Sequence, residues 1–144
     1  MNIPVFELKR QFQQIKGEIN KTIKEVLNSG FYILGKNVKI IGRLKFKIRG
    51  GYNNIIIKNG CVINEEVELR NRENGKIIIG ENVAIDSKVR LVAAKEGYLK
   101  IGPGTSIGTG TIINAGSSLD IGEFVIIGAY VSIDASKHNY EKNK

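Results

Sequence analysis

The sequence predicts an all-β solenoid preceded by one helix, and three observations lead to this fold class. The chain has 144 residues, of which 42% are apolar, with 17 glycines and only 2 prolines. Isoleucine recurs every six residues along most of the chain, whereas an earlier segment has helical spacing. A period of six fits neither an α-helix nor simple strand alternation. It is typical of short strands that stack as repeated structural units.

The first element is an amphipathic α-helix, expected within residues 3–29 of an N-terminal segment that spans 1–32. Its apolar residues recur mostly at steps of three and four, the spacing of one helix face: Phe6, Leu8, Phe12, Ile15, Ile19, Ile23, Val26 and Leu27. The stretch closes with Asn28, Ser29 and Gly30, residues that commonly end a helix.

The second element is a repeat of six residues that runs from residue 57 to 138. Six successive units begin with isoleucine, at Ile101, Ile107, Ile113, Ile121, Ile127 and Ile133. The second position is mostly glycine and the fifth is mostly small or branched. The same frame begins at Ile57 and Ile79, with short insertions near 75–78 and 95–100.

Each unit is expected to place one isoleucine inward and then turn a corner. Glycine and asparagine suit such corners because they adopt positive φ at low cost. Three strands would complete a triangular turn of about 18 residues, and turns would stack at the spacing of neighbouring strands. This β-domain is assigned to residues 33–144.

The repeat resembles the hexapeptide-repeat acyltransferases over residues 35 to 138. That resemblance implies a left-handed parallel β-helix that assembles as a homotrimer with sites between subunits. It also implies transfer of an acyl group, in particular acetyl, from acyl-coenzyme A to a sugar or nucleotide-sugar acceptor. The first 35 residues resemble the opening of the DegT-like, pyridoxal-phosphate-dependent sugar aminotransferases. No part of the chain matches that family's cofactor lysine and aspartate, so no aminotransferase activity is inferred. Both families commonly serve the synthesis of surface polysaccharides.

The resemblance makes His138 the catalytic base, because the family uses a histidine that takes a proton from the acceptor. Histidine suits this task since its pKa lies near neutral pH. Asp134 would orient the imidazole, and Asn114 and Asn139 would bind substrate. For His138 the alternative is an exposed loop histidine. For Asp134 and Asn114 it is an ordinary position in the repeat, and Cys61 is expected to be a small core residue.

Two other interpretations remain open. Only six residues follow His138, whereas family members continue for several turns. The chain would then be a non-catalytic or truncated β-helix assembly module that does not bind coenzyme A. An aminotransferase fragment is the third interpretation.

The net charge of +8 is unevenly distributed. No acidic residue lies between Glu25 and Glu65, a stretch that holds seven basic residues: Lys36, Lys39, Arg43, Lys45, Lys47, Arg49 and Lys58. They form either a surface that attracts phosphate or a solvated face that keeps a β-rich chain soluble. Nucleic acid is not an expected partner, because no binding motif or row of aromatic residues accompanies the charge.

Other residue counts exclude several classes of protein. One cysteine rules out a disulfide framework, and one histidine with no Cys/His spacing argues against a metal site. No apolar run approaches the roughly 20 residues that cross a bilayer, and no signal peptide is recognisable. We therefore expect a cytoplasmic protein without a transmembrane segment.

Overall fold

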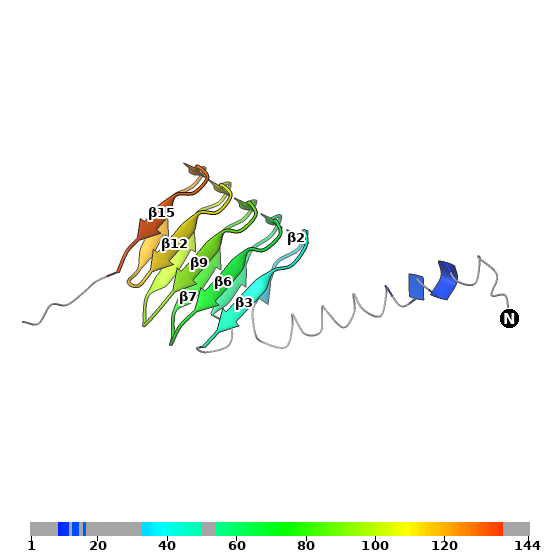
Figure 1. The fold of residues 1–144 in the computed structure, drawn as a ribbon, viewed down its shortest axis with the longest axis horizontal. Coiled ribbons are helices and arrows are strands. Elements are labelled where there is room, and N and C mark those ends of the chain that lie inside the picture. Colours follow the sequence, from blue (N-terminus) through cyan, green and yellow to red (C-terminus); the bar gives the residue numbers. More distant parts are fainter. Residues whose placement is uncertain (1–8, 12, 15, 17–32, 50–53, 137–144) are drawn as a thin grey trace, which may run out of the picture.

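The computed structural model describes residues 9–11, 13, 14, 16, 33–49 and 54–136, and its strands form three parallel sheets (Figure 1). Sheet A contains β1 (Ile33–Leu34), β4 (Ile55–Ile57), β7 (Lys76–Ile79), β10 (Tyr98–Ile101) and β13 (Leu119–Ile121). Sheet B contains β2 (Lys39–Ile40), β5 (Val62–Ile63), β8 (Ala84–Ile85), β11 (Ser106–Ile107) and β14 (Ile126–Ile127). Sheet C contains β3 (Lys45–Ile48), β6 (Glu68–Asn71), β9 (Arg90–Ala93), β12 (Ile112–Ala115) and β15 (Ser132–Asp134).

Neighbours within each sheet are three strands apart in the chain, so the backbone visits sheets A, B and C in turn. We call one such circuit a coil, and the strands β1–β3, β4–β6, β7–β9, β10–β12 and β13–β15 form coils 1 to 5. Every pairing is parallel, as between Ile55 and Ile77 or Ile113 and Ile133. The predicted parallel β-solenoid is confirmed.

The coils are longer than the predicted value of about 18 residues. Ile55 pairs with Ile77, Ile77 pairs with Leu99, and Leu99 pairs with Leu119, so each step between neighbours in sheet A exceeds that value. The last of these steps is the shortest. Six-residue steps hold on the way from sheet A to sheet C, but the return to sheet A needs an extra turn. That turn follows Arg72 in coil 2 and Ala94 in coil 3, where the sequence showed insertions.

The first position of each repeat points into the prism, as predicted. Ile101, Ile107 and Ile113 are at most 2% exposed, and their counterparts in coils 2 and 3 are buried in the same cluster: Ile57, Ile63, Leu69, Ile79, Ile85 and Leu91. Stacking leaves the end coils only partly covered. The partly buried residues packed against the core include Leu34, Phe46, Ile121, Ile127 and Ile133, which among the described residues have a coil on one side only.

Buried polar groups at the fifth position bond the backbone of the next coil. The hydroxyls of Thr105 and Thr111 donate to the carbonyls of Gly122 and Gly128 at 2.9 and 2.8 Å. The Cys61 thiol stands in the same place and donates to the Gly80 carbonyl at 3.0 Å. Cys61 is fully buried, as predicted, and burial raises the pKa of its thiol, so this group acts as a structural donor.

The corners use positive φ as expected, and among the described residues glycine and asparagine supply half of these positions, including Gly42, Gly60, Gly104 and Gly110. The non-glycine residues with φ between 53° and 61° are Asn37, Glu66, Glu73, Asn82, Lys88, Lys95, Phe124 and Tyr130. This conformation costs a residue with a Cβ atom about 1 kcal/mol or more. Bonds to the preceding coil hold it in place, as where the Lys88 amide donates to the Glu65 carbonyl at 3.0 Å.

The last coil has aromatic side chains at two of these corners. Phe124 and Tyr130 lie above Gly104 and Gly110, the corner residues of coil 4. A Cβ atom at Gly104 would lie 2.5 Å from the Phe124 ring, and one at Gly110 would lie 2.6 Å from the Tyr130 ring. Each ring therefore packs directly on the backbone of a glycine, because a side chain at that position would occupy the space of the ring.

The N-terminal helix predicted for residues 3–29 falls mainly outside the described residues. Within that segment residues 9–11, 13, 14 and 16 have helical backbone, and they are exposed. The amphipathic character of the whole segment stays a prediction.

Candidate functional site

The structure brings together two of the residues predicted for the site. Asn114 on β12 and Asp134 on β15 are partners in neighbouring strands of sheet C. The Asn114 amide nitrogen Nδ2 donates to Oδ2 of Asp134 at 3.3 Å. Asn114 and Asp134 therefore project from the same face of sheet C, while the substrate-binding role of Asn114 stays a prediction. His138 and Asn139 lie outside the described residues, so the roles of Asp134 beside His138 and of Asn139 stay predictions.

The carboxylate of Asp134 is fixed at the end of β15. Its Oδ1 atom accepts a hydrogen bond from the backbone amide of Ser136 at 2.9 Å, and it also accepts one from the Ser136 hydroxyl. An aspartate that bonds the backbone two residues on stabilises a turn. These bonds fix the conformation of residues 134–136, and Ser136 stands two residues before His138 in the sequence.

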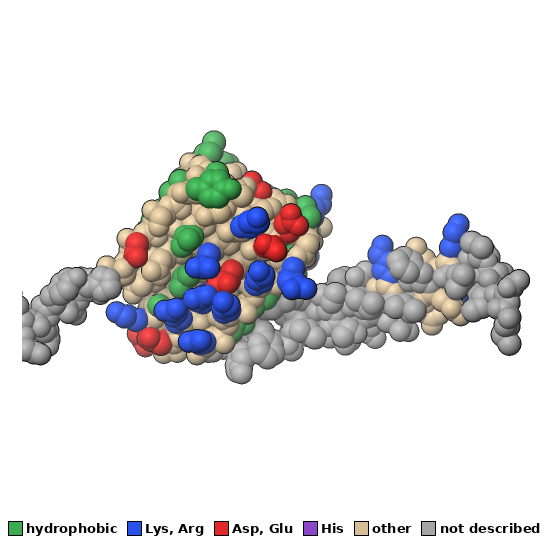
Figure 2. Space-filling model, viewed as in Figure 1, with side chains coloured by type: hydrophobic (Ala, Val, Ile, Leu, Met, Phe, Trp, Pro, Cys, Tyr) green, Lys and Arg blue, Asp and Glu red, His purple; other side chains and the backbone are tan. Residues whose placement is uncertain are grey.

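The rest of the outer face of sheet C is strongly basic over its first three strands. Outward residues alternate with buried ones, and six of them are cations: Lys45, Lys47, Arg49, Arg70, Arg72 and Arg90. We call these six residues the basic face. Figure 2 shows Lys and Arg side chains gathered over β3, β6 and β9. The alternation of a β-strand puts them on one side, and the pairing of strands puts them side by side.

One carboxylate, that of Glu68, lies at the centre of the basic face. Its Oε1 atom is 2.7 Å from Nη2 of Arg70 and 3.5 Å from Nε of Arg90, and its Oε2 atom is 3.4 Å from Nζ of Lys47. The residue is only 8% exposed. Burial acts to raise the pKa of Glu68, but Arg70 and Lys47 outweigh it, so this pKa is lower than that of an ordinary glutamate. Glu68 is therefore ionised at neutral pH and holds three cations from three strands.

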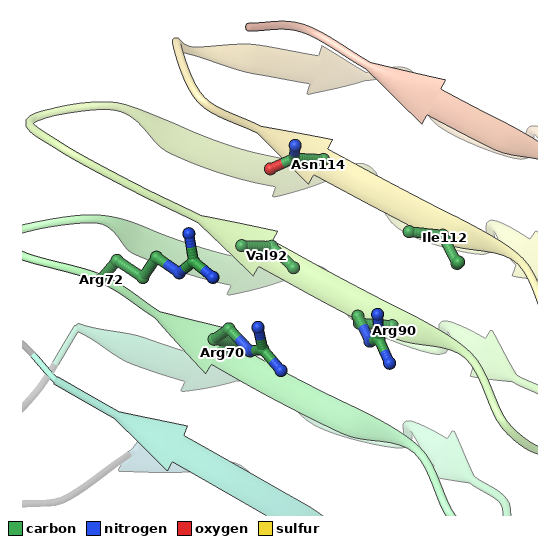
Figure 3. Close-up of a pocket in the computed structure, with 6 residues that line it drawn as sticks. All are labelled: Arg70, Arg72, Arg90, Val92, Ile112 and Asn114. Carbon is green, nitrogen blue, oxygen red and sulfur yellow. The ribbon is translucent and has the colours of Figure 1, made fainter.

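Two hollows lie on this face, and both are lined by Arg70 and Arg72. The first has a volume of about 200 Å³ and is completed by Arg90, Val92, Ile112 and Asn114. Figure 3 shows the three arginines around Val92, with Asn114 on the neighbouring strand. The second has a volume of about 300 Å³ and is completed by Lys47 and Arg49. Asn114 thus links the Asp134 pair to an arginine-lined depression.

The basic run predicted from residues 36–58 does not form one surface. Lys45, Lys47 and Arg49 lie on sheet C, whereas Lys39 lies on β2 in sheet B. Lys58 lines another hollow with Lys100, Asp120 and Glu123, among other residues. The alternation of strands and corners sends successive basic residues to different sides of the prism.

Sequence analysis missed Arg70, Arg72 and Arg90, which complete the basic face. The arginines are separated from their cross-strand partners by more residues than the predicted coil contains, because Lys47 pairs with Arg70 and Glu68 pairs with Arg90. That spacing is visible only once the length of a coil is known.

Two features are absent from the described residues. No group of three His, Cys, Asp or Glu side chains there could hold a metal ion. Within the same ranges, no helix combines the length and apolar character needed to cross a bilayer.

The chain matches no protein-family model, no curated protein and no solved structure.

Proposed function

We propose that the chain is an acyltransferase, which moves an acetyl or related acyl group from acyl-coenzyme A to a sugar or nucleotide-sugar acceptor. The observation that supports it best is the pairing of Asn114 with Asp134 beside an arginine-lined hollow. Guanidinium groups bind phosphate oxygens well, and coenzyme A and a nucleotide-sugar acceptor both carry phosphates. The solenoid and its six-residue repeat agree with the hexapeptide-repeat acyltransferases. That family would add left-handed coiling and a homotrimer.

The proposed reaction uses His138 as general base. Its imidazole takes the proton of an acceptor hydroxyl or amine while the acceptor atom attacks the thioester carbonyl. The carbon–sulfur bond then breaks, and the leaving thiolate receives a proton. The Asn114 amide has a second donor hydrogen beyond its bond to Asp134, which suits an acceptor or acyl oxygen. Asp134 would hold the imidazole in orientation.

The test is release of free thiol from acetyl-coenzyme A by the purified protein, measured over a set of nucleotide sugars. We expect turnover with at least one acceptor and a rate about 100-fold lower in His138→Ala. Lys137→Ala is the matched control and should keep the original rate. Equal rates in the wild type and His138→Ala would exclude His138 as the base. Absence of turnover with every acceptor would argue against the proposal.

A second candidate is a non-catalytic assembly module, and the exposed apolar residues of coil 5 favour it. Phe124, Ile126 and Tyr130 are 77%, 85% and 79% exposed, and such patches commonly mark contact surfaces between proteins. Titration calorimetry with acetyl-coenzyme A separates the two candidates. Lack of binding at a ligand concentration of about 1 mM would favour the assembly module.

A further inference from the structure

We propose that the outer face of β3 and β6 binds the diphosphate group of a small molecule through Lys47, Arg49, Arg70 and Arg72. This site shares Arg70 and Arg72 with the hollow beside Asn114, but it includes neither His138 nor Asp134. Binding to it does not require acyl transfer, so pyrophosphate binding and thiol release can succeed or fail separately.

The first argument is the arrangement of the four cations. Lys47 and Arg70 are partners across the β3–β6 pair, which sets their Cα atoms about 5 Å apart. Arg49 and Arg72 directly follow the ends of these two strands, two residues beyond Lys47 and Arg70 or about 7 Å away. The Arg49 amide still donates to the Asn71 carbonyl at 3.1 Å, so the ladder continues to that point. The four side chains line one hollow of about 300 Å³, a compact cluster suited to two adjoining phosphates.

The second argument is unbalanced charge. Glu68 is already shared among Lys47, Arg70 and Arg90. Within the described ranges, no carboxylate lies at ion-pair distance from Arg49 or Arg72. Like charges so close together repel one another, and an anion between them would remove that repulsion.

The third argument is an unused donor within the cluster. The Nε atom of Arg70 is buried, and it has no hydrogen-bond acceptor among the residues that the structure describes. A buried polar group without a partner costs about 1–3 kcal/mol and calls for an explanation. Phosphate oxygens accept two parallel hydrogen bonds from a guanidinium group.

The extent of the basic face favours a small molecule over nucleic acid. In the described part of sheet C the outward cations lie on β3, β6 and β9 or directly after them. The outward residues of β12 and β15 are neutral or acidic: Ile112, Asn114, Ser132 and Asp134. No aromatic side chain points outward from the described strands of sheet C. Single-stranded nucleic acid binding normally relies on such rings for base stacking.

The experiment is titration calorimetry at physiological ionic strength, with inorganic pyrophosphate as the first probe. We expect a Kd below about 1 mM for the wild-type chain. The double variant Arg49→Ala/Arg72→Ala should weaken binding about tenfold or more, because it removes two charge-assisted donors. The matched control Lys39→Ala/Lys58→Ala removes the same charge from other parts of the prism and should change Kd less than twofold.

Three outcomes would overturn the proposal. They are absence of pyrophosphate binding, equal weakening in the two double variants, and tighter binding of a short oligouridine than of any diphosphate. Coenzyme A and uridine diphosphate then serve as two further probes. Preference for either one supports the site and identifies the source of the diphosphate.

Discussion

The inner and outer residues of sheet C alternate along the same strands, but only the outer residues change in chemical type from coil to coil. Inward positions keep one kind of side chain from coil to coil, as in Leu69, Leu91 and Ile113, which are fully buried. The adjoining outward positions change from Arg70 to Val92 to Asn114. Stacking restricts what faces the prism, because each inner residue must fill the space between two others. The outer face is free of that demand and can specialise by coil.

The largest effect is expected from Leu91→Ala, which tests whether inner residues contribute more to stability than outer ones. Leu91 lies at the centre of the core with neighbours above and below, so its truncation should lower the free energy of unfolding by about 3 kcal/mol. Urea denaturation followed by circular dichroism measures this. The outward neighbour Ile112, which is 39% exposed, provides the control, and Ile112→Ala should cost less than about 1 kcal/mol. Similar costs for both variants would contradict the distinction between inner and outer residues.

A smaller effect is expected from Glu68→Gln, which tests a buried charge on the outer face of sheet C. At neutral pH the variant leaves three cations without their carboxylate and should lose about 1.5 kcal/mol of stability. Since the pKa of Glu68 is lowered in the folded state, this contribution is complete above the pKa of an unfolded glutamate, about 4.3. It should disappear as the pH falls through the folded value.

Unfolding curves of both proteins at a series of pH values measure that difference. Asp86 also has a lowered pKa, through the Thr109 hydroxyl, the Ser87 amide and the Asn64 side chain, but it titrates in both proteins and cancels. A gap in stability that stays constant down to pH 2 would show that Glu68 acts through packing alone.

The smallest effect should be a gain in stability from Lys88→Gly. Lys88 is an exposed corner residue with φ of 61°, a conformation that glycine adopts without strain. We expect the free energy of unfolding to rise by about 0.5–1 kcal/mol, measured by thermal or urea denaturation. Ser87→Gly at the same corner lacks the positive φ and should lower stability. Loss of stability in Lys88→Gly would mean that the lysine stem packs on the corner.

Much of the fold could be predicted from the sequence, because the inner residues leave a regular trace. Isoleucine at every sixth position indicated which side chains enter the prism. The small or branched residues expected at the fifth position include Thr105 and Thr111, which are also buried. The insertions in the repeat showed where the chain needs an extra turn to return to sheet A, but they did not predict the conformation of that turn. Glu73 and Lys95 adopt positive φ there, although neither residue type signals a corner.

The candidate site could be predicted only in part. Asn114 and Asp134 fall at the same position of the repeat, so their alignment followed from the period of six. The positions of Arg70, Arg72 and Arg90 on the same face could not be predicted from this period. Arg70 meets Lys47 because the coil between them is longer than predicted, and a shorter coil would have placed other residues opposite. Sequence reasoning identifies what points outward, whereas the length of the corners decides which outward residues meet.

The rings of Phe124 and Tyr130 pack on Gly104 and Gly110. The residue type at each ring position therefore depends on the residue one coil earlier. A side chain at either glycine would displace the ring above it, and a smaller residue in place of either ring would leave the glycine backbone bare. Variation at these positions is therefore expected to occur in pairs. A design that lengthens this prism by duplicating a coil should therefore copy each aromatic residue together with the glycine on which it packs.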